Sequence, residues 1–196
     1  MIAIIKYNAG NITSVQNALN RLGYESIITD NETEIRNANK VIFPGVGEAS
    51  TAMQYLQERK LDVLIKSLTQ PVLGICLGQQ LMCGFSEENN TTCLGIFNAT
   101  VKLFPPTELV PHIGWNNVKA SNSKLFEGIN EADNFYFVHS YYATITENTI
   151  ATCNYILPFS AAMQKDNFYA TQFHPEKSAD VGERVLRNFL EVNIEL

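Results

Sequence analysis

Short apolar runs alternate with helix-spaced apolar residues along the first part of the chain, and this alternation constrains the fold more than any other feature. The runs are typical of buried strands and lie at residues 2–6, 26–29, 41–43 and 71–75. Ile12, Val15 and Leu19 recur at helical spacing before Gly23, and a second helical region spans residues 53–68. Strands that alternate with helices predict an α/β fold, in which a mainly parallel sheet carries helices on both faces.

The second half of the chain changes character. It contains short β-rich segments, at residues 100–104, 116–119, 134–138, 143–146, 150–156, 161–165 and 168–171. We expect these segments to form antiparallel hairpins added to the parallel core, with Asp166 and Asn167 in a tight turn. A last helix is predicted over residues 178–192, with Ser178 as its N-cap. No linker or repeat divides the chain, so residues 1–196 are expected to form a single domain.

Composition argues against several classes of function. The formal charge is −6, and no run of Lys or Arg marks a nucleic-acid-binding surface. No apolar run is long enough to cross a bilayer, and the first residues lack the basic region and cleavage site of a signal peptide. The four cysteines form no C-x-x-C pair and no metal-ligand spacing. We therefore expect a cytoplasmic protein with reduced thiols and no metal site.

One of these cysteines stands between two glycines, where an apolar run meets a helical pattern. Gly74, Cys76 and Gly78 form G-x-C-x-G, the cysteine counterpart of the G-x-S-x-G nucleophile elbow. A sharp strand-to-helix turn brings the residues on either side of the nucleophile close together, and glycine avoids the clash. The start of the helix favours a thiolate, and the N–H of Leu77 points at an oxyanion formed beside it. An ordinary turn with a structural cysteine would give the same match, so the motif needs a base elsewhere.

A candidate base lies about a hundred residues downstream. The proline after His174 favours an extended conformation, in which residues i and i+2 point the same way, so Glu176 can lie beside the imidazole. A carboxylate there fixes the tautomer of the imidazole and stabilises its cation. Together with Cys76 these residues predict an activated nucleophile with an oriented base. His112 and His139 have no carboxylate two residues away, so neither comes with a residue that would orient it as a base.

The elbow G-I-C-L-G-Q-Q with a late H-P-E resembles the class I, triad-type glutamine amidotransferases. Further motifs narrow the resemblance to the glutaminase subunits of imidazole glycerol phosphate synthase: Y-N-A-G-N at 7–11, F-P-G-V-G at 43–47, P-H-I-G-W-N at 111–116, F-V-H-S-Y at 137–141 and H-P-E-K-S at 174–178. These motifs cover nearly the whole chain in the right order. The resemblance implies the three-layer, flavodoxin-like fold of that family.

The resemblance also implies roles for individual residues. Cys76 would be the nucleophile, His174 the base and Glu176 its orienter. The oxyanion hole would be formed by Leu77, Val46 and Gly47. Glutamine would be bound by Gln80, Ser140 and Tyr141. The residues that match partner-facing positions are Asn11, Trp115, Tyr136 and Lys177.

The reaction implied by the resemblance is hydrolysis of L-glutamine to glutamate and ammonia through a cysteine thioester. The ammonia would pass along a closed path to a (β/α)8-barrel cyclase subunit, bound as a heterodimer. That subunit would make imidazole glycerol phosphate and aminoimidazole carboxamide ribotide in histidine biosynthesis. No metal or organic cofactor is implied.

Other interpretations of the same residues stay open. An amidotransferase subunit of another synthase would differ in its partner. A cysteine peptidase or thiol hydrolase with the same elbow would act on peptides rather than on glutamine. A non-enzymatic interaction module on this fold would keep its function after Cys76→Ser.

Overall fold

The computed structural model of the chain describes residues 1–192, and its first half alternates strands with helices as predicted. The strands are β1 (Ile2–Ile5), β2 (Ser26–Thr29), β3 (Lys40–Phe43) and β4 (Val72–Ile75). The helices are α1 (Ile12–Arg21), α2 (Glu32–Asn37), α3 (Ala49–Glu58) and α4 (Leu61–Lys66). The sequence pattern does not predict α2, because this short helix buries only Ile35. The helical region expected at 53–68 is two helices, separated where Lys60 takes a left-handed φ of 58°.

The second half begins with the short helix α5 (Leu77–Met82) and ends with α6 (Ala179–Glu191). Between them lie β5 (Phe85–Ser86), β6 (Thr91–Thr92), β7 (Thr100–Leu103), β8 (His112–Asn117), β9 (Lys119–Ala120), β10 (Asn134–His139), β11 (Tyr141–Ala143), β12 (Thr149–Asn154), β13 (Pro158–Lys165) and β14 (Phe168–Thr171). Three 3-10 turns are η1 (Glu88–Asn90), η2 (Lys124–Phe126) and η3 (Pro175–Lys177).

The central sheet has eight strands in the order β2-β1-β3-β4-β14-β13-β12-β9. Its first five strands are parallel, and the pairs from β14 to β9 are antiparallel. The expectation that every second-half strand is antiparallel to its neighbours is therefore wrong for β14, which pairs in parallel with β4. All four residues of β14 are buried, as in a strand covered on both faces of a parallel sheet.

Two other predicted strands are misplaced. The strand expected at 116–119 begins at His112, and β8 pairs with β10 in a separate sheet. The strand expected at 143–146 is β11, which ends at Ala143 and pairs with β7. Gly114 interrupts the apolar pattern of β8, and β11 has only three residues, so local periodicity carries little signal in either. Asp166 and Asn167 form the predicted turn between β13 and β14.

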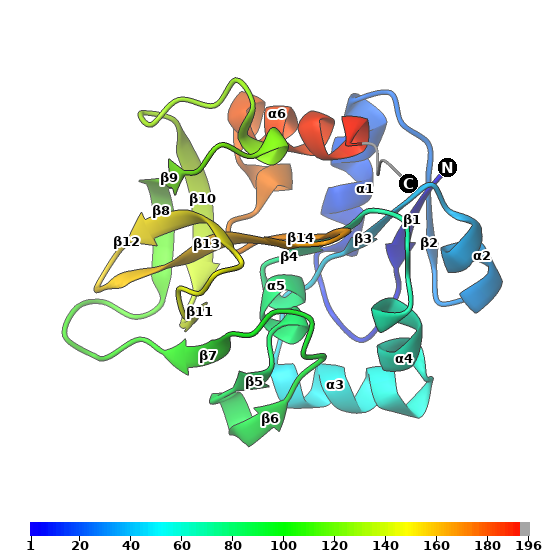
Figure 1. Cartoon of the computed structure of the whole chain (residues 1–196), viewed down its shortest axis with the longest axis horizontal. Helices are drawn as coiled ribbons and strands as arrows, with labels where there is room; N and C mark the ends of the chain where they lie inside the picture. The colour runs from blue at the N-terminus through cyan, green and yellow to red at the C-terminus, as the bar shows by residue number, and fades with distance from the viewer. Residues whose placement is uncertain (193–196) are drawn as a thin grey trace.

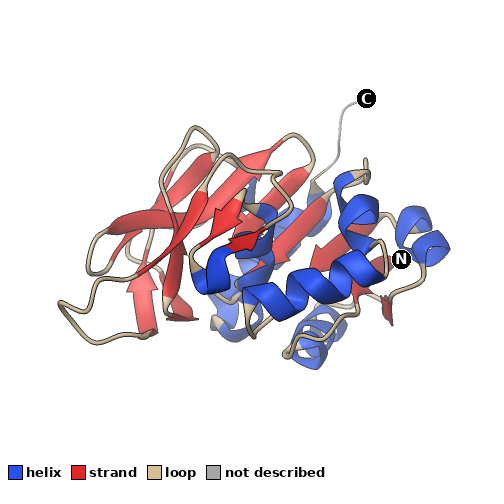
Figure 2. Cartoon of the chain, turned by 90° about the horizontal axis from the view of Figure 1, so that it is seen from below, coloured by secondary structure: helices blue, strands red, loops and turns tan. Residues whose placement is uncertain are grey.

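Helices cover both faces of the parallel part of the sheet, as Figure 1 shows with α1 and α6 above it and α3 and α4 below it. Leu19 of α1 and Phe189 of α6 pack with Ile4 on one face. Met53 of α3 and Leu64 of α4 belong to the core on the other face. The strands added in the second half gather at one end of the molecule (Figure 2). The three-layer α/β fold is therefore confirmed.

The carboxyl ends of the parallel strands share one edge of the sheet, where ligands bind in open α/β folds. Tyr7 follows β1, Val46 follows β3, Cys76 follows β4 and His174 follows β14, so distant parts of the sequence meet at this edge. Within residues 1–192, no helix is long and apolar enough to cross a membrane.

Candidate active site

Cys76 joins β4 directly to α5 in a strained turn. Its φ of 54° and ψ of −106° lie outside the regions that residues with a side chain favour, a strain of about 1–3 kcal/mol. A Cβ on Gly74 would lie 3.0 Å from the carbonyl carbon of Gly78, and a Cβ on Gly78 would overlap the carbonyl oxygen of Phe43. The clash that the two glycines were predicted to avoid is confirmed, and it comes from the tight approach of α5 to β3 and β4.

The imidazole of His174 and the carboxylate of Glu176 lie side by side. His174 Nδ1 donates to Glu176 Oε1 at 2.7 Å, because an ionised carboxylate can only accept. The side chains are 1% and 0% exposed. The backbone path differs from the predicted one, since His174 is extended but Glu176 belongs to the 3-10 turn η3. The contact therefore arises from a turn after the proline and not from a continuous strand.

The imidazole of His174 lies close enough to Cys76 for the sulfur to affect its pKa. Nε2 is buried and has no hydrogen-bond partner among the described residues. Burial by itself would lower the pKa of His174, but negative charge on Cys76 and the hydrogen bond to Glu176 raise it to about 10. Negative charge at the sulfur of Cys76 therefore stabilises the imidazolium form of His174.

The pKa of His174 is expected to fall when Cys76 is replaced by alanine, because the negative charge that raises it most is lost. In the variant, burial still lowers the pKa of His174, and only Glu176 remains to raise it. The measurement is an NMR titration of the imidazole resonances in both proteins. His112, whose pKa burial lowers to about 4, serves as an internal control. An unchanged pKa of His174 in the alanine variant would show that negative charge on Cys76 does not raise it.

Asn11 contacts two residues of the predicted triad directly. Its Nδ2 donates to Glu176 Oε1 and lies 3.4 Å from Nδ1 of His174. Asn11 precedes α1 with a left-handed φ of 71°, and its side chain is partly exposed. This position was expected to face a partner, and in the structure its side chain bonds to the carboxylate of Glu176. Nothing in the sequence pattern links Asn11 to Glu176.

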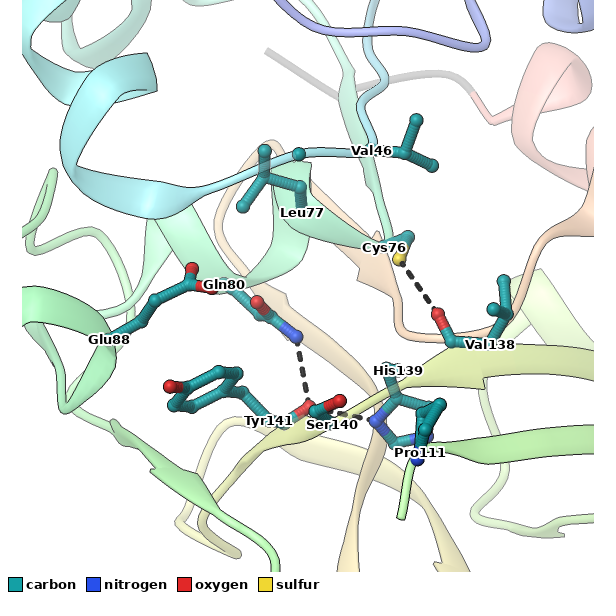
Figure 3. Close-up of a pocket in the computed structure, with 11 residues that line it drawn as sticks. Val46, Cys76, Leu77, Gln80, Glu88, Pro111, Val138, His139, Ser140 and Tyr141 are labelled. Atoms are coloured by element: carbon teal, nitrogen blue, oxygen red, sulfur yellow. Dashed lines mark hydrogen bonds between the residues drawn. The ribbon is translucent and has the colours of Figure 1, made fainter.

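A cavity of about 290 Å³ opens beside the sulfur of Cys76. It is lined by Val46, Gly47, Cys76, Leu77, Gln80, Glu88, Pro111, Val138, His139, Ser140 and Tyr141. Figure 3 shows Gln80 and Tyr141 on one side of this space and Val46 and Cys76 on the other. The structure thus brings together all the residues predicted for the oxyanion hole and for glutamine binding.

Glu88 is a cavity residue that sequence reasoning missed. It is the only carboxylate in the cavity lining, and its Oε2 accepts a hydrogen bond from the N–H of Ala49 at 2.8 Å. Burial raises the pKa of Glu88 above its usual value, although the bond from Ala49 acts in the opposite direction. In the sequence Glu87 and Glu88 resemble an ordinary acidic surface turn, so no local signal marks this residue.

One of the predicted oxyanion donors, Leu77, is not free in this conformation. The N–H of Leu77 donates to the carbonyl oxygen of Gly45 at 3.2 Å. The hydroxyl of Tyr7 donates to the carbonyl of Pro44 at 2.6 Å, and a Cβ on Gly45 would overlap that hydroxyl. The bond from Tyr7 therefore holds the loop in a conformation in which the N–H of Leu77 is bound to the carbonyl of Gly45 and cannot donate to an oxyanion.

All four predicted partner-facing residues are at least partly accessible. Trp115 on β8 is 56% exposed, and its ring lies 5.9 Å from that of Tyr136, its neighbour on β10. Lys177 is exposed on η3. The carbonyl of Tyr136 accepts a hydrogen bond from the N–H of His174 at 2.9 Å. This exposed face is therefore bonded through the backbone to the proposed base.

Ser178 and the two other histidines have roles different from those of the triad. Ser178 stands at the N-cap position of α6, but its side chain makes no capping bond and instead donates to the carbonyl of His174 at 2.6 Å.

His112 Nδ1 and His139 Nε2 are 3.0 Å apart, in a pair buried among aromatic rings. In the described part of the chain, no three His, Cys, Asp or Glu side chains group as metal ligands.

Comparisons with known proteins agree with this geometry. The family model "Glutamine amidotransferase class-I" matches residues 3–192. The imidazole glycerol phosphate synthase subunit HisH of Bacteroides fragilis strain YCH46 is 59% identical over 194 residues, which are 97% of this chain and 99% of that protein. The protein of the same name from Pasteurella multocida is 49% identical over 192 residues, or 97% of each chain.

A solved structure supports the fold independently. A glutamine amidotransferase from Thermotoga maritima superimposes with a TM-score of 0.70 at 16% identity, covering 100% of this chain and 98% of that chain. The chain therefore belongs to the class I glutamine amidotransferases and, within them, to the family of the HisH subunits of imidazole glycerol phosphate synthase.

Proposed function

We propose that this enzyme hydrolyses L-glutamine at Cys76 and passes the ammonia to a cyclase subunit with which it forms a heterodimer. The observation that carries this proposal is a strained thiol that lines an open cavity, together with a buried His174–Glu176 pair. We also propose that residues 1–196 act as one amidotransferase domain, and that the reaction needs no metal or organic cofactor.

The chemistry follows from the positions of the three side chains. The thiolate of Cys76 attacks the side-chain amide carbon of glutamine, and the negative charge moves to the amide oxygen. The imidazolium of His174 protonates the nitrogen, which leaves as ammonia, and a thioester to glutamate remains. Water then gives a proton to His174 and attacks the thioester, which releases glutamate and restores the thiolate. Glu176 stabilises the imidazolium at both steps.

The cavity offers polar groups suited to the amino-acid end of glutamine. Ser140 and Tyr141 lie on one wall and Gln80 contributes an amide. The carboxylate of Glu88 is placed to pair with the α-ammonium group of the substrate. An acidic side chain there also disfavours ligands that lack a positive charge at this end.

The loop of Pro44 to Gly47 provides a reason why hydrolysis would depend on a partner. In the present conformation the N–H of Leu77 donates to the carbonyl of Gly45, so it is not available to stabilise an oxyanion. Rotation of the peptide after Gly45 would remove the carbonyl and turn the N–H of Val46 toward the substrate, and glycine makes such a rotation inexpensive. A partner that binds the rotated form more tightly would shift the population toward it.

The partner proposed for the exposed Trp115–Tyr136 face is the (β/α)8-barrel cyclase that forms imidazole glycerol phosphate and aminoimidazole carboxamide ribotide. Free ammonia in water is mostly protonated and is then no nucleophile, so direct transfer between subunits protects it. The backbone bond between Tyr136 and His174 and the bond between Asn11 and Glu176 give this face two connections to the triad.

The experiment measures glutamate release by the isolated chain, by the chain with a cyclase subunit, and by the complex with the cyclase's nucleotide ligand. We expect the rate of glutamate release to rise about a hundredfold or more in the liganded complex, because one additional oxyanion donor changes a rate by about this factor. Trp115→Ala should weaken this stimulation without changing the melting temperature. Isolated-chain turnover equal to that of the liganded complex would refute the loop proposal, and a lack of stimulation by any cyclase would count against the partner.

A further inference from the structure

Gln172 lies next to the nucleophile, although neither the elbow motif nor the triad includes it. It follows β14, and its side chain is completely buried. Its Nε2 donates to the sulfur of Cys76 over 3.6 Å, whereas the thiol's contact with the carbonyl of Val138 is 4.0 Å long. Its Oε1 accepts from Nε2 of Gln80 at 3.0 Å. One buried amide thus connects the sulfur with a residue of the cavity wall.

A backbone carbonyl determines the direction of these bonds. Gln80 Nε2 lies 2.9 Å from the carbonyl oxygen of Tyr141, and a carbonyl can only accept, so this end of Gln80 must be the NH2 group. The second hydrogen of that group points to Gln172, whose near atom must then be its oxygen. The NH2 group of Gln172 is therefore the end that faces Cys76, and it offers a donor to the sulfur.

The carbonyl of Tyr141 is itself held in place. His139 Nδ1 donates to it at 2.7 Å, which leaves Nε2 of His139 to accept from Nδ1 of His112 at 3.0 Å. Burial lowers the pKa of both imidazoles, so they are neutral at pH 7, as this pattern of donors requires. A continuous series of directed hydrogen bonds therefore runs from the buried histidine pair to the nucleophile.

We propose that Gln172 is a further catalytic residue, which donates a hydrogen bond to the Cys76 thiolate and holds Gln80 in position for the substrate. A donor aimed at sulfur stabilises the ionised form, since bonds to charged acceptors are stronger than bonds to neutral ones. The same amide uses the second hydrogen of Gln80, so Gln80 Oε1 remains to accept from an N–H of the substrate. This inference rests on the proposed glutaminase reaction and adds a residue to it.

The test compares Q172M, which removes both bonds, with Q172E, which keeps an acceptor for Gln80 but removes the amide donor. The matched control is Q79M, because Gln79 is equally buried one residue before Gln80 and bonds instead to the carbonyl of Ser160 at 2.9 Å. The readout is the rate of iodoacetamide alkylation of Cys76 between pH 5 and pH 10, measured by mass spectrometry of its peptide. The titratable groups that face the sulfur and the cavity remain in all variants: Tyr7, Glu88, His139, Tyr141 and His174.

We expect Q172M to slow alkylation about tenfold at pH 7 and to move its midpoint up by about one pH unit, and Q79M to match the wild type. Q172E should shift the midpoint at least as far, while its KM for glutamine stays closer to the wild-type value than that of Q172M. If Q172M does not fold, Q172E carries the test, since it preserves the side-chain shape. Equal alkylation profiles for the Gln172 variants and Q79M would overturn the proposal. Alkylation needs no glutamine, so this outcome is distinct from a wild-type complex that fails to release glutamate, which would refute the proposed function itself.

Discussion

Replacement of Cys76 by serine is expected to lower glutamate release by roughly ten-thousandfold or more while the protein stays folded. Serine has nearly the same size, so the strained elbow and its contacts are kept. A hydroxyl, however, holds its proton much more tightly than a thiol, and His174 cannot form an ion pair with it in the resting enzyme. The measurement is glutamate release in the complex with a cyclase and its ligand, where turnover of the unmodified chain should be highest.

The matched control for this experiment is Cys93→Ser. Cys93 is buried outside the cavity, and its sulfur contacts only the carbonyl of Thr91 among the hydrogen-bond partners in residues 1–192. This variant should keep its turnover within about twofold, because its thiol takes no part in the reaction. If Cys76→Ser retained turnover within tenfold of the unmodified chain, Cys76 would not be the nucleophile.

Replacement of Gly78 by alanine is expected to lower the free energy of unfolding by about 3 kcal/mol or more. The new Cβ would overlap the carbonyl oxygen of Phe43, and neither backbone can move without separating α5 from β3. For a chain of this size the melting temperature should fall by roughly 6–12 °C. Alkylation of Cys76 should also change, since the elbow must shift to relieve the overlap.

Gly84→Ala is the control, because a Cβ there would meet the carbonyl oxygen of Ala99 at an ordinary contact distance of 3.5 Å. Its melting temperature should stay within about 2 °C of the unmodified value. A Gly78→Ala protein as stable as this control would show that the elbow can relax without cost. Thermal unfolding followed by circular dichroism distinguishes the two outcomes.

The parallel half of the fold could be predicted because each of its strands is a continuous apolar run between helical segments. Ile2–Ile5 and Val72–Ile75 are buried along their whole length, so their hydrophobic signal is strong and local. The short strands of the second half carry no such signal. Tyr141–Ala143 has three residues, and His112–Asn117 alternates buried with exposed positions around a glycine. Their pairing depends on partners that are distant in sequence.

The candidate site divides in the same way. Cys76, His174 and Glu176 could be named from motifs, because a nucleophile elbow and an adjacent base and carboxylate are chemical patterns within a few residues. Gln172 stands two residues before the base, yet its spacing says nothing about its bond to sulfur. Glu88 reaches the cavity from the start of the 3-10 turn η1 after β5, and no periodic pattern marks it.

The order of residues along the chain was enough to predict the alternating α/β architecture, the thiol at a strand-to-helix turn and the candidate triad, because propensity, sterics at glycine and side-chain acidity act over short stretches. The tertiary structure alone placed β14 between β4 and β13, brought Asn11 to Glu176 and Gln172 to Cys76, and put the carbonyl of Gly45 within hydrogen-bond distance of the N–H of Leu77. These are hydrogen bonds between segments many residues apart, and their distances and directions exist only once the sheet and its helices are packed.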